Sequence, residues 1–498
     1  MFTVMLGMMS TIFSSTMVNV AIPDIMGAYG IGQDRAHWMS TGFFAAMTVS
    51  MLLNAWLMRN LGARNTFVMA IAVFCVAGLI GDVSTSYELS VLARVLQGCC
   101  AGLLQPLAMN VIIPIFPPEQ RGRAIATLSM GIVLGPALGP TVGGVIVDSV
   151  GWRFTFVAAL PLSVLGAVLA LRFLPGRDDT QPPRPLNWAS LSLVILVVSS
   201  FLIGLSSGPR LGWSSVDVLT LFTISAVGLV LFFAVELHTR NPLIQMRLFL
   251  IPAFASSALV GVIFGAGMFG SIYLMPLFVQ TILGYTATKS GLLQLVAGSV
   301  MVLVFPISGR LAERLPTGYP ILAGMLLFAV SSWVLAGADI NSGFWFLSLI
   351  TLVGRIGLGL TMPSLNAGAL SAVGPDLLPY AAGTLNFVRM LGASIGINAL
   401  AITVEFREQF HLNLFRDAQA PDNSATAAFL RETVRVLAEQ GVVAAERMPY
   451  ALRMLGQSIA HRAGEASFQD GFMLLAWGFL LGAFGSLLLM RRMATRAR

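Results

Sequence analysis

Long apolar runs separated by short polar connections make up most of this chain. A membrane-spanning helix needs about 20 mostly apolar residues, because the hydrocarbon core of a bilayer is about 30 Å thick and an α-helix rises about 1.5 Å per residue. Fourteen runs reach this length: 2–23, 36–58, 66–84, 88–112, 122–147, 153–173, 188–207, 216–236, 252–280, 289–309, 319–338, 343–371, 380–404 and 469–490. The pattern predicts an all-α integral membrane protein with fourteen transmembrane helices.

Composition supports this fold class. The 498 residues are 56% hydrophobic and only 10% charged, whereas a soluble domain carries about 25% charged residues. The net charge of +7 comes almost entirely from Arg, which in a soluble protein would indicate nucleic-acid binding. Here the Arg residues lie between apolar runs, where positive charge fixes the topology instead. We therefore expect no nucleic-acid partner.

The charges in the short connections predict the orientation of the chain. An even number of spans places both termini on one side of the membrane, and by the positive-inside rule the more basic side is cytoplasmic. We therefore expect an inner (plasma) membrane protein with both termini in the cytoplasm. The basic residues on that side are Arg59, Arg64, Arg121, Arg123, Arg177, Arg184, Arg240, Arg247, Arg310, Arg314, Arg491, Arg492, Arg496 and Arg498.

Two pairs of similar segments indicate an internal repeat. AWLMRNLGARN follows the second run and GRLAERLPTGY follows the tenth, while LARVLQG in the fourth run is echoed by LVGRIGLG in the twelfth, with Arg94 and Arg355 in matching places. Parallel halves of this kind are the architecture of the major facilitator superfamily. The predicted domains are a six-helix half at 1–175, a linker with two extra spans at 176–250, and a second half at 251–498.

One connection is much longer than the rest. Residues 405–468, on the predicted external side, contain FLRETVRVLAEQ and MPYALRMLGQSIAHRA, whose apolar residues recur at helical spacing. We expect amphipathic helices at or near the membrane surface. Two interpretations stay open: a solvated cap, and a docking site for a periplasmic partner.

The sequence offers no site for chemistry on a substrate. It has no phosphate-binding loop of the form GxxxxGK[ST] and no Ser/His/Asp set, and its three Cys lack CxxC spacing. We therefore expect no enzyme activity, no metal and no cofactor, and if the chain moves a substrate, the energy must come from gradients. The residues that could have bound a metal or taken part in catalysis are the four His and three Cys of the chain: His37, His238, His411, His461, Cys75, Cys99 and Cys100.

Several motifs resemble the drug:proton antiporters of the major facilitator superfamily. LARVLQGCCAGLLQP resembles their fourth-span motif and GIVLGPALGPTVGG their fifth-span antiporter motif, while TMVNVAIP and TLNFVRMLGASIG resemble the first and thirteenth spans of the fourteen-span branch. The long external loop ending in ASFQDGF is similar to that of the inner-membrane subunit of tripartite multidrug pumps. The resemblance covers nearly the whole chain and implies two six-helix halves plus two extra central helices.

Glycines recur at every fourth position of the fifth run and form one stripe along a helix. Without side chains there, a neighbouring helix can approach closely, and two prolines add kinks by removing backbone donors. The stripe is either a packing groove alone or, as the resemblance supports, an interface that opens and closes during transport. The gating and packing candidates are Gly131, Gly135, Pro136, Gly139, Pro140 and Gly143.

Charged and polar residues inside the runs are candidates for the substrate cavity or for coupling. A guanidinium inside a membrane costs several kcal/mol, so it normally faces a cavity or a partner. Arg94 and Gln97 share one helix face and serve either coupling or a structural hydrogen-bond hub. Arg355 and Arg389 have the same two interpretations, or they extend toward the cytoplasmic surface. Asn19, in TMVNVAIP, is also a candidate.

The turns after the second and tenth runs resemble the charged latch that holds the two halves together on the inside. The first copy departs from the family pattern, because Ala55 stands where an opening Gly is usual and the usual acid is missing near Arg59. The second copy is better preserved. The latch candidates are Arg59, Gly62, Gly309, Glu313 and Arg314.

The acid that couples protons in many family members is missing from its usual place. Aligning TMVNVAIP on the family pattern puts Ser14 at this position. Asp24 and Asp148 lie at the external ends of their runs and are the alternative proton sites. Coupling through such a terminal acid, coupling through a substrate that itself carries the proton, and uncoupled facilitation all stay open.

The resemblance implies a secondary active transporter that exports amphiphilic drugs or metabolites across the inner membrane by alternating access, with a proton link. Internal Arg residues without a central acid predict a neutral to positive cavity, which favours anionic or neutral amphiphiles over organic cations. The expected partners are such a substrate, membrane lipid and, if the long loop docks one, a periplasmic adaptor with its outer-membrane channel. A lipid or metabolite facilitator of the same fold, and a transporter-shaped protein that binds without moving anything, are the alternatives.

Overall fold

The computed structural model describes residues 2–115, 135–136, 138–177, 185–239, 242–374, 377–419 and 423–494. In these ranges it contains helices and connections but no strand, which confirms the all-α prediction. Gly131, Arg121, Arg123, Arg184, Arg240, Arg496 and Arg498 lie outside the described residues. The helices are α1 (Phe2–Tyr29), α2 (Gln33–Ala36), α3 (Trp38–Val83), α4 (Tyr87–Ile115), η1 (Trp152–Phe156), α6 (Leu160–Phe173), α7 (Trp188–Leu211), α8 (Val216–His238), η2 (Met246–Leu250), α9 (Pro252–Thr281), α10 (Ala287–Arg314), α11 (Gly318–Leu335), α12 (Phe344–Ser371), α13 (Leu378–Asp417), α14 (Ser424–Glu439) and α15 (Ala444–Ala494).

The number of helices agrees with the predicted number of spans. Within the described ranges, 12 helical stretches are long and apolar enough to cross a membrane. One of them, Gln33–Val83, has 51 residues and can cross twice. Residues 138–149 are also helical and belong to the predicted fifth span. The structure is therefore consistent with fourteen spans.

Gly62 marks the point where α3 reverses direction between its two crossings. Its φ of 80° and ψ of 165° interrupt the helical conformation, and φ in this range favours glycine. A Cβ there would also approach the backbone of Gly176 and Arg177 to 2.5–2.7 Å. The sequence can therefore turn tightly here only because this position has no side chain.

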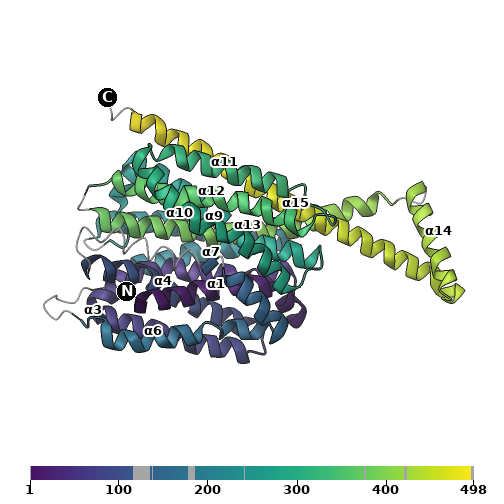
Figure 1. Ribbon diagram of the computed structural model, residues 1–498, viewed down its shortest axis with the longest axis horizontal. Coiled ribbons are helices and arrows are strands. Elements are labelled where there is room, and N and C mark those ends of the chain that lie inside the picture. Colours follow the sequence, from purple (N-terminus) through teal and green to yellow (C-terminus); the bar gives the residue numbers. More distant parts are fainter. Residues whose placement is uncertain are drawn as a thin grey trace.

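The N-terminal and C-terminal helices form two layers that lie side by side (Figure 1). α3 packs on α4, and α1 on α6 and α4, in one layer; α13 packs on α9, and α11 on α12 and α15, in the other. The largest hydrophobic cluster joins the layers, with Phe44 and Met47 of α3 beside Phe269 of α9. The start of α1 and the end of α15 lie at one end of the bundle, called here the termini end, and α14 lies beyond the other, called the hairpin end.

The extra helices α7 and α8 pack on each other, and α7 covers the seam between α3 and α13. Val194, Val198 and Leu202 of α7 share a hydrophobic cluster with residues of both helices. At the hairpin end, the His37 ring Nε2 lies 3.2 Å from the Ser206 hydroxyl, and Asn398 Nδ2 donates to the carbonyl of Leu202 at 3.3 Å. The extra pair therefore contacts both layers instead of standing apart from them.

Residues 405–419 and 423–468 form a helical hairpin at one end of the bundle (Figure 1). The two predicted amphipathic segments are helical, as α14 and the start of α15. Two predicted spans are longer than expected, because α13 continues past residue 404 to Asp417 and α15 begins at Ala444 instead of 469. Near the base, Asp470 accepts from Arg407 Nε at 2.5 Å and lies 2.8 Å from His411 Nε2. Hydropathy detects only the part of a helix in lipid, so it missed both extensions.

Candidate functional site

A small cavity lies where the two layers meet. It is lined from α1, α3, α4, the fifth span, α9, α10, α12 and α13, and its volume is about 40 Å³. A drug-sized ligand needs roughly 300–1,000 Å³, so the central cavity is too small for one in this conformation and holds at most a few waters. The lining residues are Met8, Thr11, Ile12, Ser15, Phe43, Phe44, Met47, Ala101, Gln105, Pro136, Met268, Phe269, Met301, Phe305, Met362, Arg389 and Met390.

Methionine and phenylalanine make up most of the central cavity wall, and both layers contribute them. The rings of Phe44 and Phe269 meet across the boundary between the layers, with centroids 4.5 Å apart. Methionine side chains are unbranched and polarizable, and they adapt to ligands of different shape. The wall can therefore enclose varied apolar groups without a fixed outline.

Four polar side chains enter the central cavity: Thr11, Ser15, Gln105 and Arg389. Arg389 is only 4% exposed and donates from Nη2 to Asn386 Oδ1 at 2.5 Å. Gln105 Oε1 has no hydrogen-bond partner within the described structure. No acidic residue lines the cavity among the residues that the structure describes. A buried guanidinium without a facing carboxylate favours an anion or a strong acceptor.

Arg94 does not line the central cavity but forms a hub inside the N-terminal layer. It is fully buried, donates from Nε to the carbonyl of Met39 at 3.0 Å, and donates from Nη1 to Gln97 Oε1 at 3.0 Å and to Ser14 Oγ at 3.1 Å. Its guanidinium carbon lies 4.3 Å from the centre of the Phe43 ring, and Nη2 has no partner in the described structure. Ser14, Arg94 and Gln97 thus join α1, α3 and α4.

Arg355 occupies a related position in the C-terminal layer. It is 4% exposed and donates from Nη2 to Gln294 Oε1 at 3.0 Å, while Gln294 Nε2 donates to the carbonyl of Ile272 at 3.4 Å. An Arg–Gln pair therefore occurs in both layers. In the second, the glutamine comes from α10 instead of the arginine's own helix, so the repeat is not exact at this level.

Asn19 is fully buried and accepts a hydrogen bond from Ser40 Oγ at 2.5 Å. This contact joins α1 to the start of α3. The Nδ2 atom of Asn19 has no partner in the described structure. Of the six residues that the sequence proposed for the cavity or for coupling, only Arg389 lines the central cavity.

The described part of the glycine stripe packs against α1. A Cβ on Gly135 would collide with Ile12, and one on Gly139 with the Thr16 hydroxyl. A Cβ on Gly143 would lie 2.9 Å from the Cα of Met17. The fifth span therefore approaches α1 so closely that side chains would separate them. Pro136, next to the stripe, lines the central cavity.

Contacts between the layers concentrate near the hairpin end. Thr141 Oγ1 donates to the carbonyl of Gly291 at 2.8 Å, and Gln280 Nε2 donates to the carbonyl of Val20 at 3.0 Å. A Cβ on Gly291 would collide with the carbonyl of Pro140. These contacts place the fifth span against α10 and α9 against α1, so they close this end of the bundle.

Asp148 adds a carboxylate to this contact between the layers. It accepts from the backbone N–H groups of Ala287 at 3.3 Å and Thr288 at 2.8 Å, at the start of α10. Partial burial opposes its ionisation, but hydrogen bonds from Thr288, Thr286 and Ala287 outweigh this and lower its pKa below the ordinary value. Asp148 is therefore ionised at neutral pH in this conformation. Asp24, the other alternative proton site, is exposed nearby.

The latch candidates lie at the termini end. Gly62 makes the tight turn within α3, and Arg64 N donates to the carbonyl of Pro175 at 3.1 Å. Gly309 lies inside α10, where a Cβ would meet nothing within 4 Å. Arg59 has interactions of its own, Arg314 is exposed, and the side chain of Glu313 lies outside the described part of the chain.

Sequence inspection missed the methionines of the central cavity, Gln105 and the close approach at Gly291. The composition contained one signal, because 25 Met in 498 residues is a large number. Apolar patterning cannot separate a methionine that faces a cavity from one that faces lipid, since both occupy apolar positions of a span.

The described helices and the cavity between two layers define a multi-pass membrane protein of the transporter class. The sequence profile described as Major Facilitator Superfamily matches residues 4–397, so the chain belongs to this superfamily and is a transporter.

Two relatives and one solved structure are similar to most of this chain. The multidrug export protein EmrB of Escherichia coli (strain K12) is 30% identical over 83% of this chain and 81% of its own length. The fatty acid resistance protein FarB of Neisseria gonorrhoeae is 28% identical over 86% and 84%. A bacterial homolog of the human lysosomal transporter Spinster, in an inward-facing, unoccupied conformation, shares the fold with a TM-score of 0.62 at 15% identity, covering 98% and 96%.

Proposed function

We propose that this transporter exports amphiphilic drugs or metabolites that are anionic or neutral. The central cavity carries the proposal: flexible apolar walls suit varied hydrophobic bodies, and Arg389 is the one charged side chain described in it. The names of the relatives support it, since one exports multiple drugs and another confers resistance to fatty acids.

Transport would proceed by alternating access, with residues 1–175 and 251–498 as the two moving halves and 176–250 as the extra pair beside their seam. The hairpin-end contacts support a conformation closed on that side, and the central cavity would widen when the substrate enters. The charged latch at the termini end would hold the opposite side when it closes.

The proton link has two candidate carriers. A weakly acidic substrate can bring its own proton, and Asp24 or Asp148 at the hairpin end can bind one. Asp148 would have a higher pKa once the halves separate there, because its hydrogen bonds to the start of α10 would be lost. Proton uptake and opening of the hairpin end would then favour each other.

Substrate charge tests this function directly. In proteoliposomes, a sulfonated fluorescent amphiphile should be transported at least tenfold faster than a quaternary ammonium dye of similar size. Arg389→Gln should reduce this preference by about tenfold, because a hydrogen bond to a charged group is worth about 1.5–3 kcal/mol. Arg416→Gln, outside the cavity, serves as the control. A preference for the cation, or an unchanged preference in Arg389→Gln, would contradict the proposal.

The orientation follows from the basic residues at the termini end, which we propose is cytoplasmic. The hairpin then projects outside the inner membrane and has the properties of a docking surface for a periplasmic adaptor that leads to an outer-membrane channel. α14 has no buried residue, and Phe410, Leu414, Phe429 and Leu452 are 47%, 51%, 37% and 52% exposed. Apolar groups exposed in water favour a partner.

Deleting residues 420–460 and closing the gap with a flexible Gly-Ser linker tests the hairpin. The purified protein should fold and transport normally in proteoliposomes, because the contacts of Asp470 at the base remain. Drug resistance of a host with two membranes should be lost. The control is an insertion of four residues beside Gly441, in the turn between α14 and α15. It should change neither transport in proteoliposomes nor the drug resistance of the host. Intact resistance after the deletion would identify the hairpin as a solvated cap.

A further inference from the structure

A second cavity, larger than the central one, lies at the hairpin end. Its volume of about 640 Å³ is within the range of roughly 300–1,000 Å³ typical of ligand sites. Five elements line it, from the N-terminal layer (α2, α3, α4), the extra pair (α7) and the C-terminal layer (α13). The lining residues are Asp34, Arg35, Trp38, Tyr87, Glu88, Val91, Ile203, Ser206, Ser207, Pro209, Arg210, Glu405 and Gln409.

This hairpin-end cavity separates α4 from α7. α4 packs mainly on α3 and α1, whereas α7 packs mainly on α8, α13 and α3. Ile203 of α7, which lines the cavity, is 42% exposed, and Leu92, the residue after the lining residue Val91 of α4, is 51% exposed. In a membrane such groups face lipid tails. The cavity therefore borders both the water at the hairpin end and the lipid beside the bundle.

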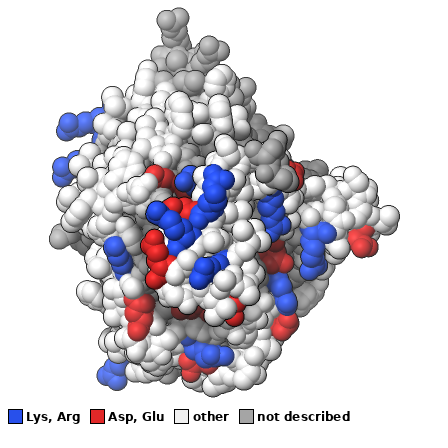
Figure 2. Space-filling view, turned by 90° about the vertical axis from the view of Figure 1, so that its right-hand side faces the viewer, with Lys and Arg blue, Asp and Glu red and all other residues white. Residues whose placement is uncertain are grey.

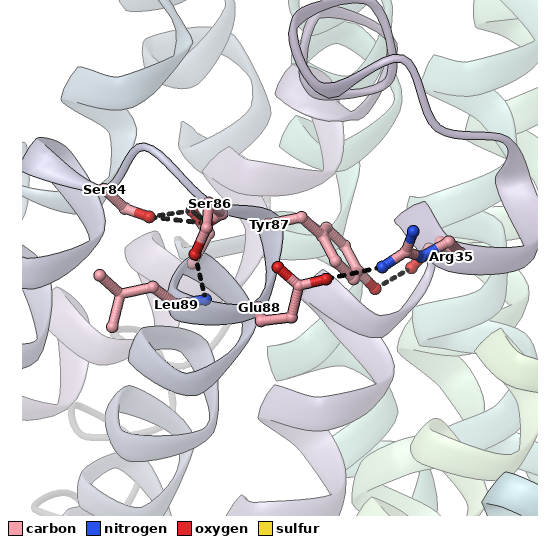
Figure 3. A network of polar contacts seen from close by, with 7 residues as sticks. Arg35, Ser84, Ser86, Tyr87, Glu88 and Leu89 are labelled. Carbon is pink, nitrogen blue, oxygen red and sulfur yellow. Dashed lines mark hydrogen bonds and ion pairs between the residues drawn. The ribbon is translucent and has the colours of Figure 1, made fainter.

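One ion pair in the cavity wall is already satisfied internally. Arg35 Nη2 lies 2.8 Å from Glu88 Oε1, and its guanidinium carbon lies 4.7 Å from the centre of the Tyr87 ring. The Tyr87 hydroxyl donates to the carbonyl of Arg35 at 2.5 Å. Figure 3 shows these three residues joining α2 to the start of α4. This pair forms one wall of the cavity.

Three further charges in the cavity have no such partner. The side chains of Asp34, Arg210 and Glu405 make no ion pair and no hydrogen bond within the described structure. Glu405 lies within electrostatic range of both Asp34 and Arg210, although no ion pair within 4 Å joins them. Figure 2 shows the hairpin-end face, where acidic and basic side chains gather together. The cavity thus offers two carboxylates, one guanidinium and the ring of Trp38.

From this geometry we propose that the hairpin-end cavity binds a zwitterionic head group in which an ammonium is joined to a phosphate. The ammonium would lie between Asp34 and Glu405 beside Trp38, and the phosphate at Arg210. A purely cationic ligand would leave Arg210 unmatched, and a purely anionic one would meet both carboxylates. Because the cavity borders lipid at Ile203, the ligand is a phosphatidylethanolamine of the adjacent leaflet, and free phosphoethanolamine shares its head-group chemistry.

A ligand in this place would contact the N-terminal layer, α7 and α13 at once. These parts must change their relative positions if the hairpin end opens, so the bound lipid would favour the closed state. The proposal concerns lipid and does not depend on which substrate the central cavity carries.

Native mass spectrometry of the purified full-length protein tests the site. Dioleoyl phosphatidylethanolamine should bind about tenfold more tightly than dioleoyl phosphatidylglycerol, and Glu405→Gln and Arg210→Gln should each weaken that binding by about tenfold. Arg431→Gln and Glu446→Gln, exposed on the hairpin, are the matched controls and should bind like the native protein. Melting temperatures establish that each variant is folded.

A measurement on the native protein keeps the test decisive if a variant does not fold. N-acetylation of the lipid amine removes the ammonium and should weaken binding by about tenfold. Equal binding of the acetylated lipid or of phosphatidylglycerol, or native-like binding by folded Glu405→Gln and Arg210→Gln, would overturn the proposal. Displacement of the lipid by free phosphoethanolamine would support the same chemistry with a soluble source, and failure of the free compound to compete would support the lipid.

Discussion

Replacing Gly139 with leucine is expected to reduce transport at least tenfold while the protein still reaches the membrane. A Cβ added at this position would collide with the hydroxyl of Thr16 and would lie 3.1 Å from the Cβ of Thr16. A leucine side chain must therefore push the fifth span away from α1. Overpacking typically costs about 1–3 kcal/mol, and about 1.4 kcal/mol corresponds to a factor of ten. Flux in proteoliposomes, compared with the yield of folded protein, measures the effect.

Gly478→Leu is the matched control for this substitution. Gly478 also lies within a spanning helix, α15, but a Cβ there would meet nothing within 4 Å, so transport and yield should both stay near the native values. Equal loss of transport and yield in Gly139→Leu would mean that the stripe serves folding alone. A loss confined to transport would support a moving interface between α1 and the fifth span.

Replacing Ser14 with aspartate is expected to be tolerated and to make transport more sensitive to a pH gradient. Ser14 Oγ lies 3.1 Å from Arg94 Nη1, and Arg94 Nη2 has no partner in the described structure, so a carboxylate would gain a buried ion pair. For each coupled proton, one pH unit contributes about 1.4 kcal/mol, or about tenfold in the accumulation ratio. A sulfonated substrate should be used, because it brings no proton of its own.

Ser10→Asp is the control for charge at a buried position of the same helix. Ser10 is fully buried, and its hydroxyl donates to the carbonyl of Gly7. An unpaired acid inside the membrane costs roughly 2.5–3.5 kcal/mol of free energy, so the yield of folded Ser10→Asp protein should fall. If transport by the native protein already depends steeply on the pH gradient when the sulfonated substrate is used, the native protein has a proton-binding group at a position other than Ser14. The search would then move to Asp24 and Asp148.

The sequence predicted the helices and the shared helix face of Arg94 and Gln97 better than it predicted the cavity. Spans follow from the thickness of the bilayer, and motif spacing places Arg94 and Gln97 on one face of α4. Which side of a helix faces the cavity depends on how that helix is rotated in the bundle, and an apolar run carries little information on this rotation. Arg94 therefore proved to lie inside one layer, whereas Arg389 lines the central cavity.

The hairpin-end cavity could not be predicted for a different reason. Arg210 and Glu405 are separated by nearly two hundred residues, and each looks like an ordinary charge at the end of a span. Only the packing of α7 along the seam between α3 and α13 brings them to one place. The extra pair of helices was visible in the hydropathy pattern, but its docking position was not.

The length of α15 has a mechanical consequence. It is one continuous helix of 51 residues, and the part before His461, whose ring Nε2 lies 3.1 Å from the carbonyl oxygen of Ile282 just after α9, projects for roughly 25 Å at 1.5 Å per residue. When the C-terminal half tilts by roughly 10° during transport, the tip of this projecting part would move by roughly 4 Å. Movement of the C-terminal half within the membrane would thus also move the hairpin tip outside the membrane. Since coupling is reciprocal, a molecule that restrains the tip would also slow the turnover of the transporter.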